Sequence, residues 1–204
     1  NRLKIFKIFK NNINYNDNLS VLDVGTTADE DESHNIILNL LKKNNNITCF
    51  SNQDCQSLKK KYPHIKNFLI GDGTNNNLSR NSFDIVYSSA TIEHVGSFEK
   101  QTSFISECFR VSKGQTFITT PNRYFPIDFH TKLPLVHFLP KFIHRQILKI
   151  LGFKYLSFEE NLNLLSKSDL INICKILNIK KYKIIEHKLW LLSSNLILII
   201  DKQD

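Results

Sequence analysis

The sequence predicts an α/β fold built on a mostly parallel sheet of seven strands, with a C-terminal antiparallel hairpin and an inserted helical cap. Three observations predict it. Short apolar runs alternate with stretches of helical period along the first 120 residues, as in βαβ units. Prolines and aromatic residues gather between residues 121 and 180, and two strand-like runs follow. With 204 residues, 41% of them apolar, the chain suits one globular domain.

Five strand candidates come before residue 120, and each is a short apolar run bounded by turn residues. Because helical stretches separate them, we expect these strands to run in the same direction in one sheet. They cover residues 21–24, 47–50, 67–70, 83–87 and 115–119.

Helical stretches lie between these strands. Residues 33–43 and 97–111 each place apolar side chains on one face, and each begins at a serine that can cap the first turn. A third helix is expected after Ser166, because Asp169 stands three residues on and completes a capping box. The runs 182–190 and 195–201 then predict a hairpin at the sheet edge.

We expect a single domain in four parts: an N-terminal extension (1–18), a cofactor-binding core (19–120), the cap insert (121–180) and the hairpin (181–204). No run is long and apolar enough to span a membrane, and the first ten residues do not look like a signal peptide. The four cysteines have neither metal-binding nor redox spacing. A cytoplasmic protein is therefore expected, with peripheral contact at the inner membrane face left open.

The formal net charge of +8 would allow attraction to nucleic acid, to an anionic membrane or to an acidic substrate. The lysines are scattered, and there is no arginine-rich run, so nucleic acid is not the expected partner.

The loops after the predicted strands should carry the chemistry, because ligands of open α/β sheets bind at the carboxyl ends of the strands. The first strand leads into Asp23 and Gly25, and the third into Asp72 between two glycines. A carboxylate beside glycines can accept a hydrogen bond from an exocyclic amine such as that of adenine, although Asp-Gly is also a common turn. The glycine fingerprint of dinucleotide sites is absent after Gly25, which favours a nucleoside without phosphate.

Four segments together resemble the class I S-adenosylmethionine-dependent methyltransferases: VLDVGTT, GDG, FDIVYSSATIEHV and TTPN. The resemblance covers residues 20–122, and the third segment is similar to the group called methyltransferase type 11. The run TTPNRYFP after the fifth strand, followed by FHTKLP, is similar to a bacterial subfamily of that group. The resemblance implies a Rossmann-like methyltransferase fold and S-adenosyl-L-methionine as cofactor.

The same resemblance implies roles for the loop residues. Asp23 would hold the first loop, and Asp54 would reach the ribose, since Ser51 and Asn52 occupy the usual acidic position. The other implied contacts are Gly25 and Thr26 with the methionine part, Asp72 and Gly73 with adenine, and Ser88 and Ser89 beside the reacting methyl group.

Methyl transfer mainly needs alignment of the nucleophile with the methyl group, and a general base helps when the acceptor must lose a proton. His94 and His130 are the candidate catalytic residues, because histidine titrates near neutral pH. Some relatives bind a divalent metal through an E-x-x-E-H motif. Here Ala90 replaces the first glutamate of that motif, so no metal is expected.

The cap contains many aromatic and cationic residues, which suits an anionic or glycan-like acceptor or a membrane surface near one. The predicted function is methyl transfer to a small or lipid-linked bacterial metabolite, with a surface-glycan precursor as one example. Two alternatives stay open. One is an RNA-binding methyltransferase, and the other is a catalytically silent cofactor-binding protein held at a membrane by residues 2–10.

Overall fold

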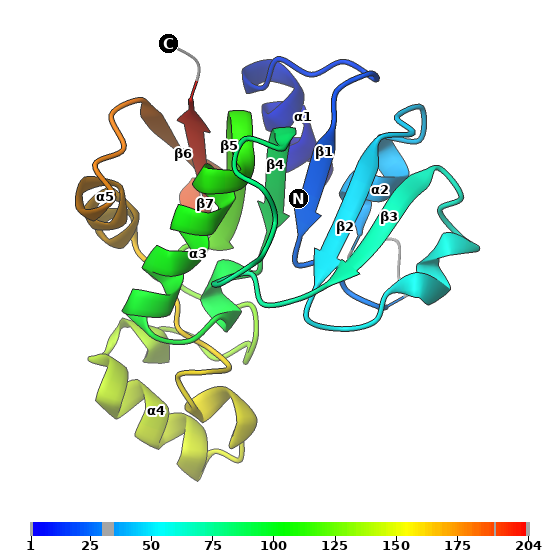
Figure 1. Cartoon of the computed structure of the whole chain (residues 1–204). Coiled ribbons are helices and arrows are strands. Elements are labelled where there is room, and N and C mark those ends of the chain that lie inside the picture. Colours follow the sequence, from blue (N-terminus) through cyan, green and yellow to red (C-terminus); the bar gives the residue numbers. More distant parts are fainter. Residues whose placement is uncertain (1, 30–34, 190, 203–204) are drawn as a thin grey trace.

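The computed structural model describes residues 2–29, 35–189 and 191–202, and its centre is a seven-stranded sheet in the order β3-β2-β1-β4-β5-β7-β6 (Figure 1). Strands β1 to β5 are parallel, while β7 runs antiparallel to both β5 and β6. The predicted mostly parallel sheet with a C-terminal hairpin is confirmed. The strands are β1 (Val21–Val24), β2 (Ile47–Ser51), β3 (Ile65–Ile70), β4 (Phe83–Ser89), β5 (Ser112–Pro121), β6 (Tyr182–Leu189) and β7 (Leu192–Asp201).

All the predicted strands are present, and they differ from the prediction mainly at their ends. Strand β5 extends beyond the predicted residues 115–119 in both directions. Its first residue, Ser112, pairs with Phe83 of β4, and its last, Pro121, pairs with Asn195 of β7. Pairing with neighbouring strands therefore sets these ends, and the local apolar run does not reveal them.

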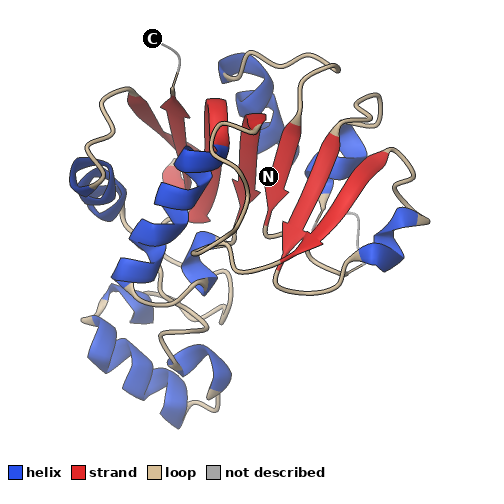
Figure 2. Ribbon diagram, viewed as in Figure 1, coloured by secondary structure: helices blue, strands red, loops and turns tan. Residues whose placement is uncertain are grey.

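Helices cover both faces of the sheet (Figure 2). Side chains of α1 and α2 pack on one face, and side chains of α3 and α5 pack on the other. The helices of the described residues are α1 (Arg2–Asn12), α2 (Ile36–Leu40), α3 (Phe98–Val111), α4 (Lys141–Ile150) and α5 (Lys167–Ile176), with short 3₁₀ turns η1 (Gln56–Lys59), η2 (Ile92–His94), η3 (Val136–Phe138) and η4 (Tyr155–Ser157).

Two predicted helix starts are confirmed. The Ser97 side chain accepts a hydrogen bond from the Lys100 amide at the start of α3. Ser166 and Asp169 form the complete capping box at the start of α5. Caps of this kind stabilise a helix by about 1 kcal/mol. A helix was also predicted over residues 33–43, and its start at Ser33 lies outside the described residues. Within that stretch, the structure has the shorter helix α2.

The N-terminal segment is part of the core and does not form a separate extension. Helix α1 buries Ile5 and Phe9 against the sheet. The Phe9 ring meets Phe117 of β5 edge-on, with 5.3 Å between ring centroids, and meets Tyr87 of β4 at 5.7 Å. The buried apolar side chains of residues 2–10 therefore pack against the sheet, which argues against the alternative in which these residues hold the protein at a membrane. None of the described helices is long and apolar enough to cross a membrane.

The inserted cap is shorter than predicted. Helix α5 lies within the predicted segment 121–180, yet its Leu170 and Ile173 are buried in the same cluster as Leu198 of β7. The cap therefore comprises residues 122–165, which contain η3, α4 and η4. In Figure 1, α4 lies beyond the edge of the sheet toward which the arrows of β1 to β4 point.

Candidate active site

A cavity of about 620 Å³ opens where β1, β2, β3 and β4 end. The sheet order changes direction between β1 and β4, and ligands of open α/β sheets bind at such a switch point. The loops after β1, β2 and β3 form one side of the cavity. The turn after β4 and the cap residues Tyr155, Glu160 and Asn161 form the other. This volume falls in the range that holds a small-molecule ligand.

Gly25 lines the cavity in a conformation that needs glycine. Its φ is +94°, and a Cβ atom built there would lie 2.0 Å from Oγ1 of Thr91. The amide of Gly25 donates to the carbonyl of Phe50, with 2.8 Å between N and O. The glycine therefore lets the loop after β1 pack directly on the turn after β4.

Asp23 supports this loop from below. It is 5% exposed, is not among the cavity-lining residues, and its Oδ2 accepts a 2.7 Å hydrogen bond from Oγ1 of Thr26, which does line the cavity. Burial raises the pKa of Asp23 to about 6, and the hydrogen bond from Thr26 opposes that rise. Asp23 thus fixes Thr26 within the cavity wall.

The loop after β3 places Asp72 and Gly73 in the cavity wall. Oδ1 of Asp72 accepts hydrogen bonds from the amide and the hydroxyl of Thr74, at 2.8 and 2.7 Å. The sequence left two alternatives for Asp72, a turn residue or a ligand-binding residue. In the structure it stabilises the turn and also lines the cavity. A Cβ atom at Gly73 would lie 2.8 Å from Cε2 of Phe104, so this loop also needs its glycine.

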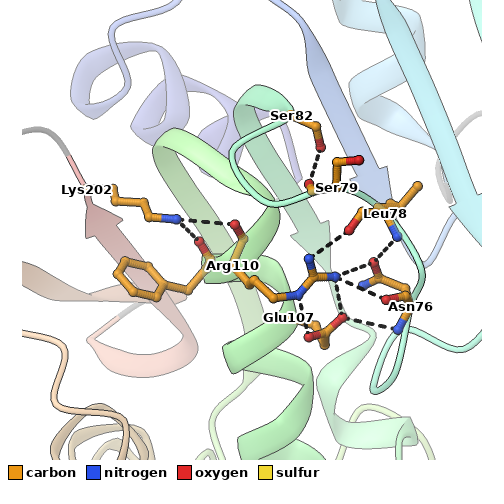
Figure 3. Close-up of polar contacts among 8 residues, drawn as sticks. Asn76, Leu78, Ser79, Ser82, Glu107, Arg110 and Lys202 are labelled. Atoms are coloured by element: carbon orange, nitrogen blue, oxygen red, sulfur yellow. Dashed lines mark hydrogen bonds and ion pairs between the residues drawn. The ribbon is translucent and has the colours of Figure 1, made fainter.

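Arg110 of α3 ties down the chain that follows this loop (Figure 3). Its guanidinium donates to the carbonyl of Leu78 at 2.7 Å and to the carbonyl of Asn76 at 3.1 Å. Glu107 pairs with the same guanidinium at 2.8 Å and accepts from the Asn76 amide at 3.1 Å. This network holds the loop after β3 against α3.

Besides Asp23, three residues predicted to bind the cofactor lie outside the cavity lining. Asp54 is exposed, and its carboxylate accepts from the Gln56 amide, while Ser51, Asn52 and Gln53 line the cavity. Ser88 is fully buried, and Ser89 hydrogen-bonds to Thr119 across the sheet at 3.1 Å. The β4 side of the wall is formed by the next two residues, Ala90 and Thr91.

The two candidate catalytic histidines meet, although they are far apart in the sequence. His94 on η2 lines the cavity, and its Nε2 lies 3.2 Å from Nε2 of His130 in the cap. Asp128 contacts Nδ1 of His130 at 3.1 Å. Burial alone would raise the pKa of Asp128, but hydrogen bonds from His130 and Thr131 hold it well below its usual range.

The sequence did not single out Asp128, which orients one of these rings, or Thr91, which packs against Gly25. The spacing of Asp128 and His130, two residues apart, was a visible sign that the acid could orient the imidazole. The contact of Thr91 with Gly25 joins the ends of two strands, and no local pattern marks it.

The family of methyltransferase domains matches residues 35–119 of this chain. A search of curated proteins finds no match. Among solved structures, the YcgJ protein of Bacillus subtilis is 12% identical, with a TM-score of 0.65 and 100% of both chains covered. A SAM-dependent methyltransferase of Methanosarcina mazei is 15% identical over 96% of each chain, with a TM-score of 0.63. One from Aquifex aeolicus is 14% identical over 97% of this chain and 87% of its own, with a TM-score of 0.60.

At these identities the solved structures show the fold alone. The match to the methyltransferase domain family is the finding that supports a methyltransferase activity. The fold they share is the Rossmann-like methyltransferase fold that the resemblance implied. The similarity of the TTPNRYFP run to one bacterial subfamily stays a prediction.

Proposed function

We propose that this chain is an S-adenosylmethionine-dependent methyltransferase, and that it methylates a small acceptor carried on a lipid while the cap rests on an anionic membrane. The cavity suits the cofactor, because Gly25 and Gly73 leave backbone surface where side chains would otherwise crowd the wall. When bound, S-adenosylmethionine supplies an activated methyl group whose C–S bond breaks toward sulfur.

The observation that carries the proposed acceptor class is an exposed apolar surface on the cap. On α4, Phe142 is 69% exposed and Ile150 is 82% exposed. Tyr155 of the neighbouring η4 is 71% exposed, and Leu151 and Phe158 are also exposed. Large apolar side chains grouped on a protein surface are typical of a contact with a membrane or a partner.

Charge favours an anionic membrane as that contact. Residues 122–165 contain six lysines and arginines against three aspartates and glutamates. Lys149 and Lys154, close to the exposed apolar side chains, are themselves exposed. Each lysine near an anionic bilayer contributes about 1 kcal/mol of attraction.

The apolar surface leads to the cavity. Tyr155 belongs to both, because it is exposed on the cap and lines the cavity. A lipid-linked acceptor could then keep its chain in the bilayer while its head group enters the cavity beside His94.

On this side of the cavity, His94 and His130 are the proposed catalytic residues. The acceptor atom donates its lone pair to the methyl carbon, and the imidazole pair takes the proton that the acceptor loses. General-base assistance of this kind contributes about 10²- to 10⁴-fold in rate. Asp128 and the carbonyl of Asn161 orient the two rings for this task.

Vesicle flotation tests the proposed acceptor side. We expect the protein to float with phosphatidylglycerol vesicles more than with phosphatidylcholine vesicles, and the double variant Phe142→Ser, Ile150→Ser to lose most of that binding. Leu3→Ser is the matched control, because Leu3 is 67% exposed and belongs to α1, outside the cap. Equal flotation of the double variant and the unaltered protein would contradict the proposal. Retention on mixed RNA that falls steeply with salt would favour the RNA-binding alternative instead.

A further inference from the structure

The two histidine rings at the cavity edge face each other through nitrogens that both carry lone pairs. Nδ1 of His94 lies 2.7 Å from the carbonyl oxygen of Asn161, which can only accept, so this nitrogen carries the ring hydrogen. Nδ1 of His130 likewise faces the Asp128 carboxylate. In the neutral rings, both Nε2 atoms are therefore unprotonated, and they lie 3.2 Å apart.

A buried carboxyl group lies beside the rings. Glu93 is 0% exposed, and its Oε2 accepts a 2.9 Å hydrogen bond from the Thr120 hydroxyl. Its Oε1 has no hydrogen-bond partner among the described residues. A buried carboxyl oxygen without a hydrogen-bond partner costs free energy. A cation bound by this oxygen and by the two Nε2 lone pairs would remove that cost.

We propose that Glu93, His94 and His130 bind a divalent first-row transition-metal ion of the zinc type. Zinc–nitrogen bonds of about 2.0–2.1 Å in a tetrahedron put two nitrogens about 3.3 Å apart, which is close to the observed spacing. One ligand atom from each of the three residues lies within 4.8 Å of the others. Imidazole ligands favour zinc, cobalt or iron over magnesium.

The surroundings also fit a metal site. Ligating histidines usually donate the hydrogen of their other ring nitrogen to a carboxylate or a backbone carbonyl. Asp128 and Asn161 provide one such acceptor for each ring. The sequence argued against a metal because Ala90 replaces a glutamate, but the structure brings His130 from the cap, 36 residues away from His94.

The ion would also narrow the acceptor class, and this step rests on the proposed function. His94 lines the cavity, so an ion bound to it borders the space for the acceptor. A Lewis acid there favours an oxygen nucleophile, because it stabilises the oxygen after its proton is lost. With the ion bound, both Nε2 lone pairs would be metal ligands, so the acceptor would lose its proton to solvent and the imidazole pair would act as the base only in the metal-free protein.

Metal binding can be measured without any acceptor. The full chain is treated with chelator, desalted and titrated with zinc chloride by calorimetry, with metal content read by mass spectrometry. We expect one zinc per chain, and we expect His94→Gln and His130→Gln each to weaken binding by more than about 100-fold, since even outer ligands contribute 10- to 100-fold. Asp128→Asn should weaken it about 10- to 100-fold. His64→Asn, which alters a histidine outside the cluster, should leave zinc binding unchanged.

Cobalt separates this site from the cysteines, all four of which are buried. We expect visible absorption from cobalt with nitrogen and oxygen ligands and no thiolate charge-transfer band. Binding of S-adenosylhomocysteine by each variant checks that it is folded. If the folded protein takes up no zinc, or if His130→Gln binds it as tightly as the unaltered chain, the metal site is wrong. Vesicle binding would be unaffected by that result, so the proposed function is tested separately.

Discussion

The two walls of the cavity are built in different ways. The proposed cofactor wall, with Gly25, Thr26, Asp72 and Gly73, has short-range side-chain hydrogen bonds at Asp23 and Asp72, and its glycines leave room for close packing on Thr91 and Phe104. The acceptor wall, made by His94 and the cap, depends on contacts across 36 and 67 residues. A shared cofactor can be recognised through backbone space, whereas an acceptor is recognised through side chains brought together by the whole fold.

Gly25→Val should have the largest effect on the cofactor wall. The added side chain would meet Thr91, and the left-handed backbone alone costs a non-glycine residue about 1–2 kcal/mol. We expect the dissociation constant for S-adenosylhomocysteine, measured by calorimetry, to rise at least about 100-fold, or about 2.7 kcal/mol.

Gly152→Ala is the control for that prediction. Gly152 has a φ of +89°, but a Cβ atom there would meet nothing within 4 Å. It should lower stability by about 1 kcal/mol and leave cofactor binding unchanged. Tight binding by Gly25→Val would show that the close packing of Gly25 on Thr91 does not shape the cofactor wall.

Asp23→Asn tests how the free energy of unfolding depends on pH at the residue that supports this wall. The pKa of Asp23 is about 6 in the folded chain and lower when unfolded, so the folded state keeps its proton longer. Its contribution to stability is therefore fully present below about pH 4, falls as the pH rises to about 6, and is lost above that. The loss should be on the order of 3 kcal/mol, and Asp23→Asn should remove it.

Urea unfolding of the unaltered protein and of Asp23→Asn between pH 4 and pH 7 measures this contribution. The effects of the other titrating groups cancel when the two free energies of unfolding are subtracted. Parallel stability curves for the two proteins would mean that Asp23 does not titrate differently on folding.

Asp72→Ala should weaken S-adenosylhomocysteine binding by about 1.5–3 kcal/mol if its carboxylate binds the adenine amine, as hydrogen bonds to charged groups do. Thr74→Val is the matched variant, because it removes the hydroxyl that donates to Asp72 but keeps the carboxylate. We expect less than about 1 kcal/mol from it in the same titration. Equal losses would assign Asp72 to the turn alone.

His130→Gln should have the smallest effect on the cofactor. His130 is not among the cavity-lining residues and contacts the site through His94. We expect the dissociation constant for S-adenosylhomocysteine to stay within about twofold, which is about 0.4 kcal/mol. A large loss in calorimetry would mean that the two walls are not independent.

The sequence predicted those regions whose contacts lie between residues close together in the chain. Strands, the Ser97 cap and the Ser166–Asp169 capping box depend on neighbouring residues, and they were predicted. Helix α1 was missed because lysines interrupt its apolar residues, and Phe9 shows its role only against the sheet. A helical cap was predicted without the bounds of its helix: the apolar residues of α4 recur at helical spacing, but most of them are exposed and only Leu148 is buried.

The candidate site divides in the same way. The loops of Gly25 and Asp72 were located by the turn residues that follow each strand, whereas Asp54 was assigned from a neighbouring position and lies outside the cavity lining. The pairing of His94 with His130, and their closeness to Glu93, could not be predicted because the fold of the cap sets that distance.

The position of β7 has a consequence for how the chain is made. Strand β7 lies between β5 and β6, so the edge of β5 has no partner until the last strand has been synthesised. A nascent chain would expose that row of backbone groups while residues 122–191 are synthesised, and such edges are prone to aggregate. Slow elongation or chaperone shortage should therefore lower the yield of this protein more than that of a protein with a similar sheet whose strands pair in order of synthesis.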